Sequence, residues 1–362
     1  MGRESERLSR VIRVVEPFFD RREFVRLDRN EDPDGWAADR LSEWLSSLTP
    51  YDIAAYPDSS DLVRGISDWQ CLSDRQVVVT AGSDAGIKLI FETYLDPGDA
   101  ILHLDPSWRM YEVWAAAYRA HLVGVPFGEG LVMDVDFLVA RIREAKPRLV
   151  VIANPNQPTG TLLSLNELEE IAIASQEVGA LLVIDEAYFM FSDITGKSLI
   201  GLYPHVLVVR TFSKAFGMAG LRVGYILSSE DRIEELKLLR PLSDASSLAL
   251  SAASYSLAHI DWVESRVRSI IEARDFLHSE FASLGVGCFQ SWTNFLLVNS
   301  PTASNAVACM SNCKLSGYLL KGPLEVGPEQ NVIRISVGSK STMEKFWNEC
   351  RDFFGQIPLD SR

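Results

Sequence analysis

A lysine and an arginine eight residues apart offer the clearest chemistry in this sequence. Lys214 and Arg222 stand in the segment TFSKAFGMAGLR (residues 211–222), which is rich in small residues and follows an apolar run. Partial burial in such a loop lowers the pKa of an amine and favours imine formation with a carbonyl compound. A guanidinium is permanently charged, and its planar fork suits a phosphate. The segment indicates an amine nucleophile beside an anion-binding arginine, although a lone lysine after a strand is usually a solvated charge.

A carboxylate closes a second apolar run, LLVID at residues 181–185. Burying Asp185 at the end of a strand is unfavourable unless a cation or a hydrogen-bond donor meets it. A protonated pyridine nitrogen would be such a partner, and Tyr188, three residues further on, could reach the same ring. The alternative interpretation is an aspartate that caps the turn after the strand.

Two more segments carry polar groups where strands are expected to end. The segment AGSDA (81–85) opens a helix, so its amides and the helix dipole could bind an anion. In NPNQPTG (154–160), two prolines and a glycine fix a turn, while Asn156 and Gln157 offer directed hydrogen bonds. Each segment alone is also typical of an ordinary strand-ending loop.

Apolar runs alternate with helical segments from about residue 76 to residue 228, which predicts an α/β domain with a mostly parallel sheet. Ligands bind beyond the carboxyl ends of such strands, where all four segments lie. The strands are expected at 77–80, 100–104, 121–125, 149–153, 181–185, 206–210 and 223–227, and the helices at 84–94, 111–119, 135–144 and 164–178.

A helical stretch then leads to a second, smaller unit. We expect this stretch at 232–239, 248–259 and 262–284, followed by strands at 294–298 and 332–337 and a helix at 341–354. A chain of 362 residues exceeds one ordinary core, so two domains are expected. We place a large domain at residues 45–250 and a small domain at residues 1–44 plus 251–362.

In this order and spacing, the segments resemble class I/II aminotransferases of pyridoxal-phosphate fold type I, and among them the histidinol-phosphate aminotransferases. The resemblance covers residues 25 to 354, approximately, and implies an aspartate-aminotransferase-like fold with a mostly parallel mixed sheet and a smaller α+β domain. It rests on Asp185-x-Ala-Tyr188, on Ser213-Lys214 26 residues after that tyrosine, on Gly220-Leu-Arg222, and on NEDP (30–33), AYPD (55–58) and GSD (82–84).

The resemblance implies pyridoxal 5'-phosphate as cofactor and a role for each matching residue. Lys214 would hold the cofactor as a Schiff base and move the proton, Asp185 would keep the pyridine nitrogen protonated, and Tyr188 would donate to the phenolic oxygen. Other cofactor contacts are implied for Trp108 (stacking), for Ser83, Asp84, Ala85, Ser213 and Arg222 (phosphate), for Asn156 or Gln157 (phenolic oxygen), and for Tyr56 from the partner subunit of a homodimer. Substrate contacts are implied for Arg334, Lys321 and Asn30.

Three departures from the family pattern affect these roles. Gln157 stands where the family usually has asparagine, so the contact to the phenolic oxygen is expected to change or to pass to Asn156. Lys321 replaces an arginine that the histidinol-phosphate enzymes use, and a lysine binds phosphate as a point charge only. Asp32 replaces an asparagine and adds a carboxylate near the expected substrate mouth.

The implied reaction is amino transfer between an amino acid, or an amino phosphate such as histidinol phosphate, and a 2-oxo acid. A pyridoxal-phosphate decarboxylase or lyase of the same fold, for example one acting on threonine phosphate, is the alternative. A non-catalytic relative of the fold is a third hypothesis, against which the presence of Lys214, Asp185, Tyr188 and Arg222 argues. A nicotinamide enzyme is disfavoured because no Gly-x-Gly-x-x-Gly follows any strand.

Composition restricts the partners and the compartment. The net charge of −14 disfavours nucleic acid and anionic membrane surfaces. Five cysteines without a Cys-x-x-Cys pair are expected to be plain thiols, with no metal site. The amino terminus lacks the pattern of a secretory signal and no run of 18 apolar residues occurs, so a cytoplasmic protein is expected. The stretch Val11–Phe19 would help to cover a dimer interface or form a surface helix.

Overall fold

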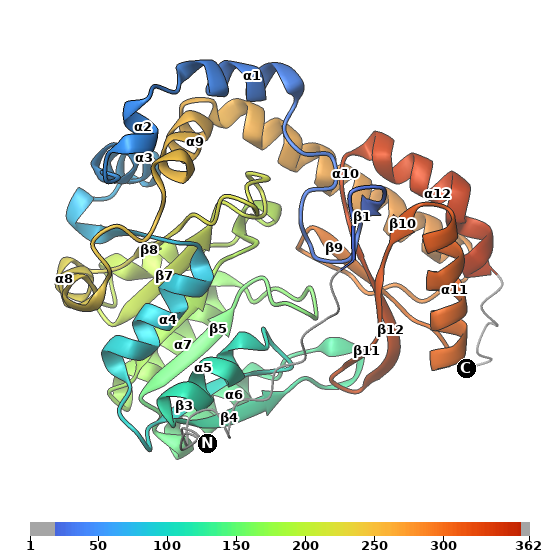
Figure 1. The fold of residues 1–362 in the computed structure, drawn as a ribbon. Helices are drawn as coiled ribbons and strands as arrows, with labels where there is room; N and C mark the ends of the chain where they lie inside the picture. The colour runs from blue at the N-terminus through green and yellow to red at the C-terminus, as the bar shows by residue number, and fades with distance from the viewer. Residues whose placement is uncertain (1–18, 356–362) are drawn as a thin grey trace, which may run out of the picture.

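A seven-stranded sheet with helices on both sides forms the larger part of the described chain, residues 19–355 of the computed structural model (Figure 1). The neighbouring pairs from β7 to β4 are parallel. Strand β8 runs antiparallel to both of its neighbours, so the sheet is mostly parallel but mixed, as expected. In spatial order the strands are β2 (Val77–Thr80), β8 (Gly224–Leu227), β7 (Val206–Thr211), β6 (Leu181–Asp185), β5 (Leu149–Ala153), β3 (Ala100–Asp105) and β4 (His121–Pro126).

Alternate residues of the central strands pack into two apolar clusters, one on each face of this sheet. In β6, Leu182 and Ile184 belong to the first cluster, whereas Leu181 and Val183 belong to the second. Because both faces are buried, the strands are continuously apolar and show no polar alternation. The first face is covered by α6 (Val135–Ala145) and α7 (Leu165–Glu177), and the second by α4 (Ser83–Tyr94), α5 (Met110–Tyr118) and α8 (Glu230–Leu239).

Polar side chains fix where several helices begin. The Ser164 hydroxyl accepts a hydrogen bond from the Glu167 amide at the start of α7, and the Glu167 carboxylate accepts one from the Ser164 amide, which together form a capping box. The remaining helices are α1 (Ala38–Ser47), α2 (Tyr51–Ala54), α3 (Ser60–Gln70), α9 (Ser247–Ala258), α10 (Ile260–Ser283), α11 (Ala303–Leu315) and α12 (Lys340–Gly355), with short 3-10 turns η2 (Asp74–Gln76), η3 (Glu129–Leu131), η4 (Phe189–Phe191) and η5 (Gly196–Gly201).

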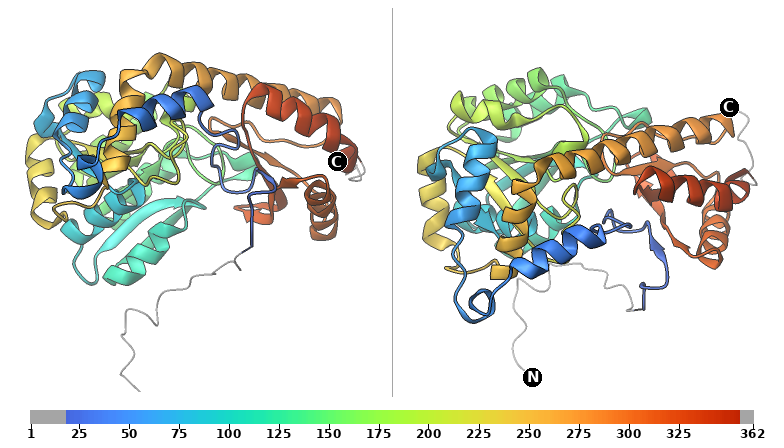
Figure 2. Two further views of the ribbon diagram at one scale, coloured as in Figure 1. Left: turned by 45° about the horizontal axis from the view of Figure 1, so that its top comes forward. Right: turned by 90° about the horizontal axis from the view of Figure 1, so that it is seen from above.

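The 24-residue helix α10 connects the large sheet to a second group of strands, as Figure 2 shows from above. This group is an antiparallel sheet of order β11-β12-β9, and a short parallel pair β1–β10 lies beside it. The first apolar cluster continues into this part and includes side chains of β9, β12 and α12. The strands are β1 (Val25–Arg26), β9 (Phe295–Val298), β10 (Tyr318–Leu319), β11 (Lys321–Val326) and β12 (Glu329–Ser336).

Both predicted domain limits fall inside helices of the structure. The limit between residues 44 and 45 falls within α1, and the limit between 250 and 251 falls within α9. The division into residues 45–250 and residues 1–44 plus 251–362 therefore stays a prediction.

Residues 1–18 lie outside the described part of the chain, and with them the amino-terminal segment that lacks a secretory-signal pattern and all of Val11–Phe19 except Phe19. Within residues 19–355, none of the helices combines the length and the apolar character that crossing a bilayer requires.

Candidate active site

A cavity of about 180 Å³ lies at the carboxyl ends of β5, β6 and β7. Parallel strands end at the same edge of a sheet, so their following loops meet there. The side chains that line the cavity come from all four segments singled out in the sequence and from the loop before α5. They are Ser83, Asp84, Trp108, Ala153, Pro155, Gln157, Asp185, Ala187, Tyr188, Thr211, Ser213, Lys214, Ala219 and Arg222.

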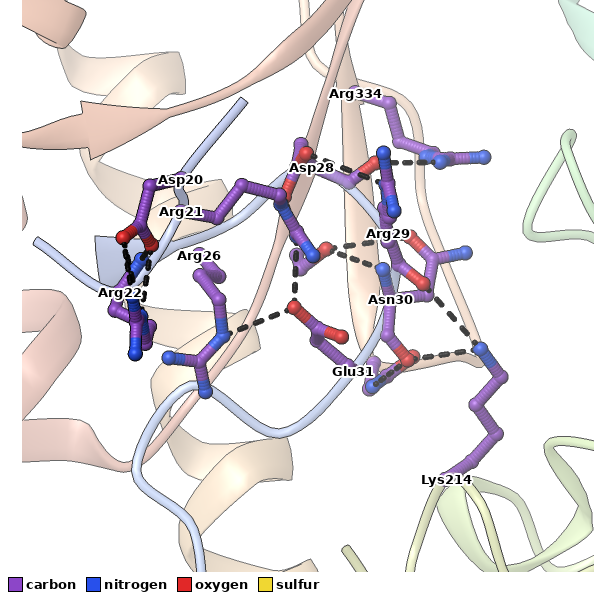
Figure 3. Close-up of polar contacts among 12 residues, drawn as sticks. Asp20, Arg21, Arg22, Arg26, Asp28, Arg29, Asn30, Glu31, Lys214 and Arg334 are labelled. Carbon is purple, nitrogen blue, oxygen red and sulfur yellow. Dashed lines mark hydrogen bonds and ion pairs between the residues drawn. The ribbon is translucent and has the colours of Figure 1, made fainter. Parts of the chain in front are cut away.

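Lys214 projects from the loop after β7 toward the amino-terminal segment (Figure 3). Its Nζ donates a hydrogen bond to the main-chain oxygen of Asn30, 2.9 Å away. Burial lowers the pKa of this amine to about 7, and the positive charge of Arg334 adds to the effect. A substantial fraction of the amine is therefore neutral near pH 7, and only the neutral form is nucleophilic.

Asp185 ends β6 with a buried carboxylate. Its Oδ2 accepts a hydrogen bond from the hydroxyl of Tyr111 at 2.6 Å, and its Oδ1 accepts one from the amide of Ala187 at 3.2 Å. Burial raises the pKa of Asp185 to about 6. Within the described chain the carboxylate has no ion-pair partner, so a cationic group in the cavity would find a buried anion ready to pair with it.

Tyr188 lies three residues beyond Asp185 and shares the cavity with it. The side-chain amide of Asn30 donates a hydrogen bond to the Tyr188 oxygen at 3.0 Å. Burial raises the pKa of Tyr188 to about 12, so the phenol keeps its proton and can donate it to an acceptor in the cavity.

The turn between Asp185 and Tyr188 is fixed by a buried ion pair on the other side of the chain. Glu186 accepts a hydrogen bond from Nε of Arg210 at 2.8 Å, and both side chains are almost fully buried. Glu186 also accepts a hydrogen bond from the amide of Gly196 at 2.6 Å. Because Glu186 is held in this way, Asp185 and Ala187 on either side of it line the cavity.

The part of the cavity wall formed by Ser213, Arg222 and the start of α4 is suited to an anion. Gly82 precedes α4 with φ +89°, and a Cβ at this position would come within 2.8 Å of the guanidinium of Arg222. Glycine therefore lets Arg222 lie against the start of α4, where free amides and the helix dipole favour negative charge. Arg222 also donates a hydrogen bond to the hydroxyl of Ser213 at 3.0 Å.

Several residues named from the sequence do not line the cavity. The amide of Asn156 is occupied by the main-chain oxygen of Pro106 at 3.0 Å and by the hydroxyl of Thr159 at 2.8 Å, so Gln157 is the amide that faces the cavity. Ala85 follows Ser83 and Asp84 in the first turn of α4. The side chain of Tyr56 is 92% exposed on the surface.

The three residues expected to contact substrate lie on the small sheet or against it. Arg334 on β12 and Lys321 on β11 face each other across the strand pair. Arg334 donates a hydrogen bond to the main-chain oxygen of Asp28 at 2.9 Å, and Asn30 follows two residues later (Figure 3). The main-chain oxygens of the segment Asp28–Asn30 therefore accept hydrogen bonds from both Arg334 and the amine of Lys214.

Asp32 does not take the place expected for it. Instead of facing the substrate mouth, its carboxylate is buried against Arg266 of α10, with which it forms an ion pair. Gly217 of the Lys214 loop packs closely on this pair, because a Cβ there would come within 2.7 Å of Asp32 Oδ2.

Comparison with known proteins connects this site to a family. The family model for aminotransferases of class I and II matches residues 60–349. The chain belongs to this family.

Curated relatives of this aminotransferase share about a third of its residues over most of its length. The histidinol-phosphate aminotransferase of Roseiflexus castenholzii is 34% identical over 322 residues, which cover 87% of this chain and 85% of that protein. Histidinol-phosphate aminotransferase 2 of Nitrosococcus oceani is 30% identical and covers 90% of this chain and 91% of that protein.

Solved structures show the same fold. The histidinol-phosphate aminotransferase of Sinorhizobium meliloti in complex with pyridoxal-5'-phosphate superposes with a TM-score of 0.81 at 24% identity, covering 92% of both chains. The aspartate aminotransferase of Thermus thermophilus with maleate gives 0.76 at 21% identity, again with 92% of both chains covered. The aminotransferase therefore has pyridoxal-phosphate fold type I.

The family determines the reaction class and the cofactor. The protein is a pyridoxal-phosphate-dependent transaminase, and the relatives do not favour the alternative of a decarboxylase or lyase. Two features of the cavity fit this cofactor. The buried Asp185 carboxylate has no cation partner within the described chain, and Gly82 lets the guanidinium of Arg222 lie against the start of α4, where an anion is favoured.

Tyr111 was not predicted from the sequence to be part of this aminotransferase's site. Tyr111 stands three residues after Trp108, and their rings meet edge to face at 5.5 Å. The only available signal was a tyrosine on an apolar helix, which is more often a core residue. Its contact with Asp185, 74 positions away in sequence, appears only in the folded chain.

Proposed function

We propose that Lys214, Asp185, Tyr188 and Arg222 are the principal cofactor residues of this transaminase. The observation that carries the proposal is the buried amine of Lys214, with its pKa lowered to about 7, in one cavity with the other three side chains. When bound, pyridoxal phosphate supplies an aldehyde that joins the substrate's amine and a ring that withdraws electrons from it. The phosphate would be held by Ser213, Arg222 and the amides of Ser83–Ala85, and Trp108 would pack on the ring.

The side chains of this protein then have distinct tasks. The amine of Lys214 would be released from the cofactor when the substrate's amine takes its place, and the free neutral amine would then take the proton from the α-carbon of the substrate and return it later in the cycle. The carboxylate of Asp185 holds a proton on the pyridine nitrogen, and the hydroxyl of Tyr188 donates to the phenolic oxygen. Gln157 lines the cavity at the position expected for an asparagine, so its longer side chain is proposed to make the second contact to that oxygen.

We propose an amino donor that carries a carboxylate or phosphate, with a 2-oxo acid as acceptor. The permanently charged fork of Arg334 suits a carboxylate, and Lys321 on the neighbouring strand adds a second positive charge. The names of the relatives make histidinol phosphate the first donor to test.

A donor panel tests this proposal directly. The holoenzyme is mixed with 2-oxoglutarate and either histidinol phosphate or one of the common amino acids, and glutamate formation is measured. Glutamate from histidinol phosphate at the highest kcat/KM supports the amino-phosphate substrate. Turnover of a free amino acid alone would replace it, and release of carbon dioxide without an acceptor would contradict amino transfer.

We further propose that the protein works as a homodimer. Several large apolar side chains are exposed on α1, on α2 and just beyond them, which is unusual for a surface that faces only water. A second subunit would cover them and could bring Tyr56 to the phosphate of the neighbouring site. These side chains are Leu41, Leu45, Tyr51, Ile53 and Tyr56.

A cytoplasmic location is also proposed. All five cysteines are unpaired thiols, as is usual for proteins in a reducing compartment.

A further inference from the structure

The side-chain hydroxyl of Tyr111 forms a hydrogen bond with the carboxylate of Asp185. Its side chain is 0% exposed, within the second apolar cluster, and its hydroxyl donates to Asp185 Oδ2 at 2.6 Å. The other oxygen of Asp185 accepts from the amide of Ala187. Tyr111 is absent from the cavity wall, so it can act on a bound molecule only through the lining residues that it contacts.

We propose that Tyr111 is a positioning residue that keeps Asp185 ionised and directed toward the cavity. The inference rests on the proposed function, in which Asp185 pairs with the protonated pyridine nitrogen. A hydroxyl that donates to a carboxylate stabilises the charged form of that carboxylate. The ring of Tyr111 also packs edge to face on Trp108, so one residue links the carboxylate to the proposed stacking group.

The charges around Asp185 show why such a donor is needed. Burial raises the pKa of Asp185 and the hydrogen bond from Tyr111 lowers it, while Glu186 and Asp84 oppose its ionisation as neighbouring negative charges. The pKa of Tyr111 is itself raised by burial and by Asp185, so the hydroxyl keeps its proton and remains a donor. Tyr111 therefore offsets part of the effect of burial on Asp185 and favours its charged form.

The test compares Tyr111→Phe with a matched tyrosine on the same face of the sheet. Tyr94 of α4 belongs to the same apolar cluster and donates to a carboxylate, Glu235, at 2.8 Å, but neither residue lines the cavity. The probe is pyridoxine 5'-phosphate, which has the pyridine ring and the phosphate but no aldehyde, so it cannot bond to Lys214. Its dissociation constant from the full-length apoprotein is measured by equilibrium dialysis between about pH 5 and about pH 8.5.

In the wild type, affinity is expected to fall as Asp185 becomes protonated at low pH. In Tyr111→Phe this fall should begin about one pH unit higher, the size expected for losing one hydrogen bond to a carboxylate. Affinities of the two proteins should converge at the alkaline end, and Tyr94→Phe should follow the wild type throughout.

An Asp185→Asn variant distinguishes a failure of the inference about Tyr111 from a failure of the proposed role of Asp185. If it binds weakly at every pH while Tyr111→Phe follows the wild type, the inference about Tyr111 is overturned and the role of Asp185 stands. If Asp185→Asn binds the probe as the wild type does, the proposed role of Asp185 fails and the inference about Tyr111 fails with it.

Discussion

The amine of Lys214 donates a hydrogen bond to the main-chain oxygen of Asn30, although 184 positions separate the two residues in sequence. The side chain of Asn30 simultaneously donates to Tyr188, and its amide donates to the hydroxyl of Ser336. The amino-terminal segment therefore connects the Lys214 loop of the large sheet to the small sheet. A change at Asn30 should therefore alter the pKa of the Lys214 amine directly.

Replacing Asn30 by aspartate should raise the pKa of Lys214. Asn30 has φ +53°, a conformation that aspartate also tolerates, so the backbone should persist. The new carboxylate would stabilise the ammonium form, so the pKa should move upward from about 7. Only the neutral amine of Lys214 bonds to pyridoxal phosphate. The midpoint of the pH dependence of the bonding rate should therefore rise by about one pH unit. Stopped-flow absorbance measures this rate, with Asn348→Asp on the exposed side of α12 as control. An unchanged midpoint would show that Asn30 does not lie beside the reacting amine.

Replacing Arg334 by lysine should weaken substrate binding without loosening the cofactor. Lysine keeps the charge but loses the fork that pairs with a carboxylate. We expect KM for the amino donor to rise roughly tenfold or more, because a bidentate charged contact is reduced to a single one. Steady-state kinetics check KM, and equilibrium dialysis checks cofactor affinity. Arg351→Lys on α12 is the matched surface change. A donor KM equal to that of this control would remove Arg334 from the substrate site.

Replacing Asp32 by asparagine should destabilise the protein, although asparagine is the residue expected from the family pattern. Asp32 pairs with Arg266, and the two side chains are 4% and 17% exposed. Removing one charge of a mostly buried pair leaves the other poorly compensated, so the free energy of unfolding should fall by about 2 kcal/mol. Urea denaturation of the apoprotein measures the change. Glu264→Gln on the same helix breaks an exposed ion pair with Arg268 and should have little effect. Equal stability of the two variants would mean that the Asp32–Arg266 pair contributes nothing.

Mixing two inactive variants should restore activity if Tyr56 completes the neighbouring subunit's site. Lys214→Ala lacks the amine and Tyr56→Ala lacks the phosphate contact, so each homodimer should be impaired. In a mixed dimer, one site contains both native residues. Random exchange of subunits should therefore restore about a quarter of the wild-type activity per site. The measurement is turnover after co-refolding of the two variants, with each variant alone as control. Activity that never exceeds the sum of the separate variants would argue that Tyr56 does not act across an interface.

The strands of the large sheet and the four loop segments were accessible from the sequence because each signal is local. Continuous β-branched runs predict buried parallel strands, and loops at their carboxyl ends must gather at one edge. Helix α11 was missed because its buried residues are small (Ala306, Cys309 and Cys313) and give only a weak apolar face. Strand β11 was missed because Gly322 and Pro323 interrupt it, which an edge strand tolerates.

Contacts between distant segments were beyond the reach of sequence patterns. The hydrogen bond between Tyr111 and Asp185 spans 74 positions, and the pair of Asp32 with Arg266 spans 234. The sequence around each of these residues gives no indication of its distant partner. The helical segments expected at 232–239, 248–259 and 262–284 were within reach, because they match α8, α9 and α10 to within two residues, and Pro241 lies in the gap between α8 and α9, where it removes a backbone donor.

The amine of Lys214 is proposed to carry pyridoxal phosphate, and one measurement tests this role most directly. The purified protein is incubated with pyridoxal phosphate, its visible absorbance is recorded before and after sodium borohydride, and the reduced protein is digested for peptide mass mapping. We predict a yellow band that borohydride bleaches and a single pyridoxyl label on Lys214. A protein that stays colourless, or a label on any other lysine, would contradict the account.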